Sequence, residues 1–329
     1  MDVYLLFCDF TGAFFTLHPF MPNKTCLSVK LLLATALCLL LQGVAAQPSF
    51  LPPSEQYRPD RLRKVVLGET VLFVVTSVGL YFLWYKKFPK SRFHFINDNR
   101  EWLQVDKIGH ATTAYNLAAI HHDLMRWSGV KPGPAITTSA LSALAYMSII
   151  EIMDGFSKDW GFSKGDMLAN ISGAALFAAQ QHFWGEQRIG MKFSTRLTPY
   201  ARHNPALLGT NTASRLMKDY NGQTYWLSFN IRSFLPDHSK FPIWTNLAVG
   251  YGAEGMTGAT KNPSALHEKA LPSFDRYRQF YIAADADLFR MKTGDAVQAP
   301  LYMLQFLKVP SPAIEYNSKR KFILHPLHY

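Results

Sequence analysis

Hydrophobic and polar residues follow two different periods along this chain. From residue 62 to about 190, long apolar runs carry polar groups three or four positions apart, the spacing of one helix face. From about residue 225 onward, residue type alternates at every second position, as in half-buried strands. The pattern predicts an α+β protein, mostly a membrane-associated helical bundle over 62–190 with a small antiparallel β-containing region over 191–329.

The bundle is expected to contain four helices. They are predicted at 62–87, 102–127, 135–154 and 163–184, separated by short stretches rich in Gly, Pro and polar residues. Ser163 is followed three positions later by Asp166, a pair similar to a capping box, and this pair predicts the start of the fourth helix.

The C-terminal region shows three clear strands, a doubtful last one, and a short helix near 301–308. The clear strands are predicted at 225–231, 245–252 and 280–289. A transmembrane barrel requires about eight strands, so a small sheet packed on the bundle is favoured. In the third strand the even-numbered apolar positions share one face, and Asp285 and Asp287 share the other, which we expect to be solvated.

Residues 1–46 have the features of a secretory leader. Two lysines precede an apolar core over 31–41, and small residues ending at Ala46 predict cleavage there. An uncleaved anchor is the alternative, although the core is shorter than a spanning helix. Residues 47–61 are rich in Pro and polar groups and are interpreted as a linker.

The segment 62–87 is the best candidate for insertion into a membrane. Residues 65–85 are apolar except for Glu69 and small hydroxyls, and basic residues flank both ends. This run just reaches the roughly 20 residues that span a bilayer. The alternative is a buried first helix of the bundle.

Composition narrows the possible partners. The formal net charge is +11, but no RNP motif or zinc-finger spacing accompanies it, so nucleic acid is not expected and a membrane lipid surface is. The cysteines all lie in the leader, so a cleaved chain would have no disulfide, thiolate metal site or Cys nucleophile. They are Cys8, Cys26 and Cys38.

Three helical runs carry the candidate chemistry. Side chains three or four apart share one helix face, so three such helices would direct their polar groups into one buried cluster. The eight candidate catalytic residues are Asp106, Lys107, His110, Glu151, Asp154, Ser163, Asp166 and Asn170.

Two hypotheses for this cluster stay open. One imidazole and several carboxylates could catalyse hydrolysis by acid–base chemistry. They could also bind a hard divalent ion through His110, Glu151 and Asp166. Alternatively, Lys107 neutralises a carboxylate and Asn170 bridges backbones, so that the cluster fixes helix register. No HExxH, GxSxG or P-loop motif is present, and the sequence names no cofactor.

These motifs also carry a family resemblance. The segments 105–110 (VDKIGH), 151–155 (EIMDG) and 160–170 (WGFSKGDMLAN) resemble the YfiM-type family, described as predicted periplasmic lipoproteins of unknown function. Later residues, such as 225–228, look like longer members from Bacteroidetes-type bacteria. A looser likeness exists to VanZ-like membrane proteins.

The resemblance implies a bacterial envelope location, periplasmic and membrane-associated, without implying a reaction. We therefore expect an envelope protein of unknown activity with a structural, scaffold or assembly role. The alternative is a metal- or acid–base-dependent hydrolase that acts on an envelope lipid or glycan.

Overall fold

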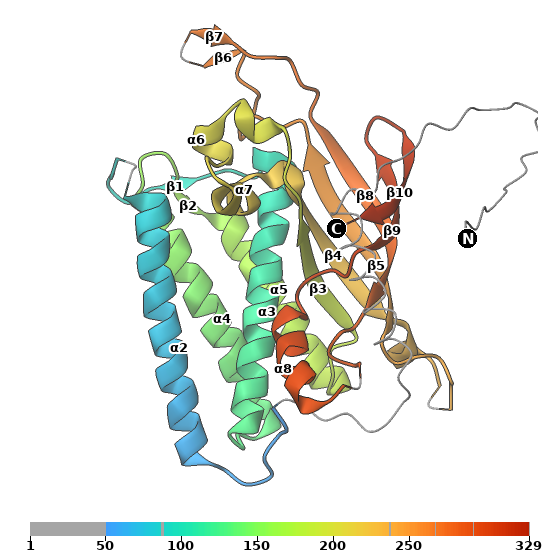
Figure 1. Cartoon of the computed structure of the whole chain (residues 1–329). Coiled ribbons are helices and arrows are strands. Elements are labelled where there is room, and N and C mark those ends of the chain that lie inside the picture. Colours follow the sequence, from blue (N-terminus) through green and yellow to red (C-terminus); the bar gives the residue numbers. More distant parts are fainter. Residues whose placement is uncertain (1–50, 87–88, 237, 267, 292, 329) are drawn as a thin grey trace, which may run out of the picture. The chain divides into compact units, whose positions relative to one another are not determined.

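The computed structural model describes residues 51–329, except 87–88, 237, 267, 292 and 329. The predicted leader over 1–46 therefore lies outside the described residues, as does the start of the predicted linker. Figure 1 shows the helices as one layer and a twisted sheet as the other, with α3 beside the strands.

Four long helices build the first layer. They are α2 (Pro59–Leu80), α3 (Val105–Trp127), α4 (Pro132–Gly155) and α5 (Lys164–Trp184). α2 and α4 each begin with a proline in the first turn, where the missing N–H is not needed. At α5, the Ser163 hydroxyl accepts a hydrogen bond from the Asp166 amide, and Gly185 ends the helix with a φ of 70°. The predicted helices are confirmed.

Helix α3 is the centre of this layer and packs against α4, α5 and the sheet. The α3–α5 approach is very close, because a Cβ on Gly173 would lie 2.0 Å from the Ala111 carbonyl oxygen. Only glycine allows this separation. The apolar contacts around it form a core of Tyr115, Ala118, Ala143, Phe177 and Met191.

The predicted segment 62–87 forms α2 followed by a π-helical turn, Tyr81–Tyr85. Its acidic residue Glu69 lies 2.8 Å from His121 of α3. Within the described ranges, α4 is the one helix long and apolar enough to cross a membrane by length and composition. A membrane crossing by 65–85 therefore stays a prediction.

The second layer is a six-stranded antiparallel sheet with the order β10-β9-β8-β5-β4-β3. Its strands are β3 (Ile189–Thr195), β4 (Gln223–Asn230), β5 (Thr245–Glu254), β8 (Tyr277–Ala286), β9 (Ser311–Asn317) and β10 (Phe322–His328). The three clear predicted strands and the doubtful last one are present, but the sequence pattern missed β3 and β9. The α+β class is confirmed, and the sheet is larger than expected.

Short elements connect the layers. Strand β1 (Phe95–Ile96) pairs in parallel with β2 (Phe162–Ser163) beside the ends of the long helices. The others are α6 (Pro205–Leu208), α7 (Thr212–Lys218), α8 (Asp295–Leu304), the hairpin β6 (Ala265–Leu266) with β7 (Lys269–Ala270), and 3₁₀ turns at Glu101–Gln104, Tyr200–Arg202, Tyr220–Gly222 and Ile231–Phe234. The predicted helix at 301–308 overlaps α8, which begins six residues earlier.

The two faces of β8 are the reverse of the prediction. Phe280 and Ile282 are 45% and 56% exposed, whereas Tyr281 and Asp285 are buried. The expectation that Asp285 lies on a solvated face is therefore wrong. It failed because alternation identifies which residues share a face, while the packing of Asp285 against Lys192 decides which face points inward.

Candidate functional site

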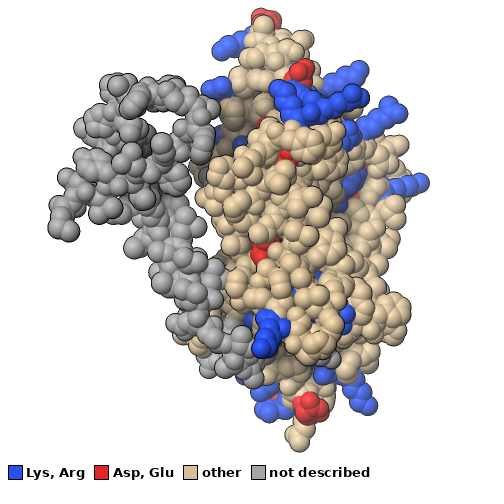
Figure 2. Space-filling view, turned by 90° about the vertical axis from the view of Figure 1, so that its right-hand side faces the viewer, with Lys and Arg blue, Asp and Glu red and all other residues tan. Residues whose placement is uncertain are grey.

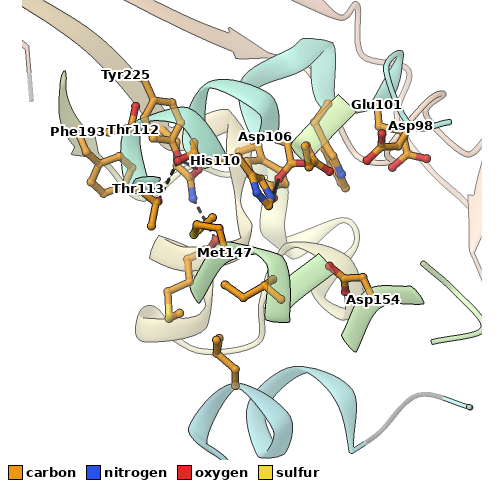
Figure 3. A pocket seen from close by; sticks show the side chains of 18 of the residues that line it. Asp98, Glu101, Asp106, His110, Thr112, Thr113, Met147, Asp154, Phe193 and Tyr225 are labelled. Carbon is orange, nitrogen blue, oxygen red and sulfur yellow. Dashed lines mark hydrogen bonds and ion pairs between the residues drawn. The ribbon is translucent and has the colours of Figure 1, made fainter. Parts of the chain in front are cut away.

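The eight candidate residues meet at one end of the helical layer, where α3 and α5 begin and α4 ends. Beside them lies a cavity of about 740 Å³ between α3, α4 and the sheet. Figure 3 shows Asp106 and His110 reaching this space from α3, and Asp154 reaching it from α4.

The cluster has a row that faces the cavity and a row behind it. The lining residues among the candidates are Asp106, His110, Asp154 and Asp166. The supporting residues are Lys107, Glu151, Ser163 and Asn170, which contact the first row without lining the cavity.

His110 lies at the centre of the cluster. Its Nε2 is 4.0 Å from an Asp106 oxygen on the cavity side. Its Nδ1 is 3.4 Å from Glu151 Oε1 and 3.2 Å from Asn170 Oδ1. The imidazole therefore has one hydrogen-bond acceptor, Asn170 Oδ1 at Nδ1, and a carboxylate near each nitrogen, an arrangement that favours the charged form.

Lys107 joins three carboxylates. Its Nζ is 2.7 Å from both Asp98 and Asp166 and 3.6 Å from Asp106. The Ser163 hydroxyl donates to Asp98 (2.6 Å) and accepts from the Asp166 amide (3.0 Å). These contacts tie the segment before α3 to the start of α5.

The sequence analysis missed three members of the cluster. Asp98 contacts Lys107, Tyr85 donates to Asp154 (2.8 Å), and the Tyr220 hydroxyl donates to Asp106. Asp98 and Tyr220 lie outside the four helices predicted for the bundle, and Tyr85 lies in the predicted helix 62–87, which carried none of the candidate polar groups. Tyr85 and Tyr220 are 69 and 114 positions from their partners. No periodic signal in the sequence could have identified them.

Burial shifts the acids toward their neutral forms. Desolvation raises the pKa of Glu151 to about 8 and that of Asp154 to about 7. Desolvation, followed by the nearby charge of Asp106, also raises the pKa of Asp166. Burial works against a charged His110, but Asp106, Asp166 and Glu151 outweigh it and raise its pKa. The site therefore holds several groups that exchange protons near neutral pH.

A divalent ion is a second chemical possibility. One ligand atom each from Asp106, His110 and Asp166 lies within 4.8 Å of the others. Glu151, which the sequence analysis placed in the metal set, faces the other imidazole nitrogen. The donors suit a hard or borderline cation. However, the Lys107 ammonium already contacts Asp166, so one cation balances this carboxylate without a metal.

The eight candidate residues lie within the part of the chain that matches a known family. Residues 94–181 match the model of the family described as "Predicted periplasmic lipoprotein (DUF2279)", consistent with the YfiM-type resemblance. The match supports an envelope, periplasmic location for a protein of unknown activity. No curated protein and no solved structure matches the chain.

Proposed function

We propose that this envelope protein carries an acid–base site that acts on an amphipathic, lipid-like molecule held in the cavity. One observation supports the proposal most directly. Titratable side chains with raised pKa values line a cavity large enough for a ligand, in addition to the contacts of Asp154 with Tyr85 and of Asp166 with Lys107. A purely structural polar cluster would not require this space.

His110 has the position of a proton donor. It lines the cavity, its Nε2 lies on the side of Asp106, and its Nδ1 is within hydrogen-bond distance of Asn170 Oδ1. A charged imidazole can give the Nε2 proton to a leaving group, while Asp154 or Asp166, each with a raised pKa, accepts a proton from water or substrate. The chemistry needs no group other than these side chains.

The walls of the cavity favour an acyl chain over a glycan. Away from the carboxylates the lining is mainly aliphatic and aromatic, and a sugar would leave its hydroxyls unpaired there. The apolar lining includes Leu117, Ile120, Met147, Ile150 and Phe193. We therefore propose that a polar head lies at His110 and an apolar tail extends along these residues, which also implies membrane association.

A scaffold role is the second candidate, and one observation favours it. Lys107 links Asp98 to Asp166 at contact distance and so fastens α3 to α5. Under this alternative, the Lys107→Met and His110→Gln variants would both act through stability. Under the acid–base proposal, Lys107→Met destabilises the fold, whereas His110→Gln removes activity from a folded protein.

The test uses the purified full chain with a total envelope-lipid extract in detergent, followed by mass spectrometry of the lipids over time. We expect at least one lipid class to be converted, and His110→Gln to slow this by roughly 10²–10⁴-fold. The matched control is His182→Gln, an exposed residue in the last turn of α5, which should convert lipid at the wild-type rate.

Thermal unfolding of each variant accompanies the assay. Equal rates for His110→Gln and wild type, or no conversion by folded wild-type protein, would overturn the proposal. If a chelator abolishes lipid conversion and added Mn²⁺ restores it, the site is a divalent-ion site at Asp106, His110 and Asp166 and the acid–base proposal is overturned.

A further inference from the structure

One face of the six-stranded sheet is buried and combines charged and polar side chains with the apolar cluster Trp226, Ala248, Tyr281, Ala283 and Ala313. The opposite, outward face is apolar. On β3 and β4 this face packs against α3 through Met191 and Tyr225, and from β4 to β10 it is exposed. Pairing aligns exposed apolar residues across five neighbouring strands, so they form one continuous surface. This stripe consists of Leu227, Val249, Ile282, Ile314 and Leu324, which are between 37% and 70% exposed. Phe280 and Leu247 extend the stripe along the strands and are also exposed.

The charged groups of the buried face are in contact with one another. Asp285 lies 2.7 Å from Lys192 and 3.7 Å from Lys308, and accepts a hydrogen bond from the Ser228 hydroxyl (2.6 Å). On the neighbouring strand, Glu315 lies 2.8 Å from His325. Burying these groups costs free energy unless they are paired. These specific contacts therefore stabilise polar side chains on the buried face, while apolar side chains occupy the exposed face.

Charged side chains are few across the middle of this surface. Figure 2 views the sheet side: most of its visible middle is uncharged, and lysines and arginines gather mainly toward the top. The turn between β9 and β10 contributes three consecutive exposed basic residues, Lys319, Arg320 and Lys321. An apolar band with a basic rim matches acyl chains bordered by anionic headgroups.

We propose that the outward face of this sheet, defined by the stripe from Leu227 to Leu324, lies against lipid acyl chains, with the β9–β10 turn at the anionic headgroups. Polar-in and apolar-out alternation is the pattern of strands that contact lipid. An exposed continuous apolar surface is unfavourable in water, and its basic rim is complementary to anionic headgroups. The inference rests on the envelope location and not on the acid–base site.

The experiment measures flotation of the purified full chain with vesicles of phosphatidylethanolamine and phosphatidylglycerol. We expect the Ile282→Lys variant to lower the vesicle-bound fraction at least tenfold, because a lysine on a lipid-facing strand loses its hydration. The matched control is Leu207→Lys, which places lysine at a similarly exposed apolar residue in α6, away from the sheet, and should bind as wild type. Wild-type binding by Ile282→Lys would overturn the proposal.

A second measurement covers the case in which Ile282→Lys does not fold. Cysteine is absent from residues 47–329, so Ile282→Cys can carry a polarity-sensitive fluorophore, with the wild-type chain as the blank for its three leader cysteines. Vesicles should shift the emission of this label to the blue and leave a label at Leu207→Cys unchanged. No shift at either position would overturn the proposal.

Two further outcomes separate the alternatives. If Ile282→Lys leaves vesicle binding intact but converts a dimer into a monomer, the face contacts a second copy and the lipid proposal is overturned. Lipid conversion in detergent should be unaffected by Ile282→Lys. Wild-type conversion by His110→Gln together with loss of flotation in Ile282→Lys overturns only the acid–base proposal. Loss of conversion in His110→Gln together with wild-type flotation of Ile282→Lys overturns only the lipid-contact proposal.

Discussion

The protein buries charge in two places, at the ends of α3, α4 and α5 and on the inner face of the sheet, and the two places differ in balance. On the sheet, Asp285 lies between two ammonium groups, and Trp226 fills the adjacent space. At the helix ends, several carboxylates share Lys107 and His110 beside a cavity of about 740 Å³. The difference suggests that the sheet network serves the fold and the helical cluster serves a ligand.

Acid excess has a direct consequence for protonation. In the sheet, two lysines face the single carboxylate of Asp285, and desolvation lowers the pKa of Lys308 to about 8. In the helical cluster the cations are too few, and burial raises the pKa of Glu151 to about 8. Protons bound to the carboxylates neutralise the charge that cations leave unbalanced. Acid–base chemistry near neutral pH requires such groups, because they gain and lose protons in that range.

The largest predicted effect tests the structural role of the sheet network. Asp285→Ala leaves Lys192 and Lys308 buried without their carboxylate, so we expect a loss of roughly 3–5 kcal/mol in the free energy of unfolding. Denaturant unfolding in a fixed detergent measures this. Asp287→Ala is the control, because Asp287 is only half-buried beside Arg290 and should cost about 1 kcal/mol or less. Equal losses of unfolding free energy in Asp285→Ala and Asp287→Ala would show that the buried sheet network contributes no more to stability than the half-buried pair does.

The next effect is a pH dependence of stability that comes from the helical cluster. Burial raises the pKa of Glu151 from 4.5 to about 8, so the folded state keeps a proton that the unfolded state has lost. Stability therefore falls as the pH rises from about 4.5 to 8, by up to roughly 1.4 kcal/mol per pH unit. His110 acts in the same direction, since its raised pKa stabilises the fold at low pH and this contribution disappears as the pH rises.

Glu151→Gln isolates the carboxyl contribution. This variant should match wild type near pH 4.5 and be more stable near pH 8, with a flatter slope between. Thermal melts across this range measure the slope. A wild-type slope in Glu151→Gln would mean that the Glu151 carboxyl does not carry the pH dependence of the cluster.

The smallest effect sets the baseline for both regions. Glu186 contacts Arg188 (3.0 Å) and Arg290 (3.1 Å) at the surface, and its side chain is 38% exposed. We expect Glu186→Ala to change the free energy of unfolding by less than about 1 kcal/mol, because solvent screens such pairs. A loss as large as that of Asp285→Ala would show that burial is not what separates these networks.

Helical spacing was sufficient to predict much of the site. Residues four apart on one helix must share a face, so Asp106 with His110 and Asp166 with Asn170 could be paired without coordinates. The end of α4 then contributed Glu151 close to His110, as expected. Asp98 and Tyr220 could not be predicted, because contacts between distant segments depend on how the layers pack.

The strands were harder to predict than the helices. β3 follows directly after the helical region, and β9 contains a proline, so neither showed a clean alternating pattern bounded by turns. The inward face was also misjudged on β8. Two-residue periodicity is symmetric with respect to the two faces of a strand and contains no information about what covers each of them.

By itself, the sequence determined the helices, the period of three central strands and the eight polar residues of the cluster, because these depend on local spacing. The tertiary structure alone decided that Asp285 points inward, that Ile282 points outward, and that a cavity adjoins His110. The physical reason is that burial and pKa depend on the neighbours that packing supplies, and those neighbours come from distant parts of the chain.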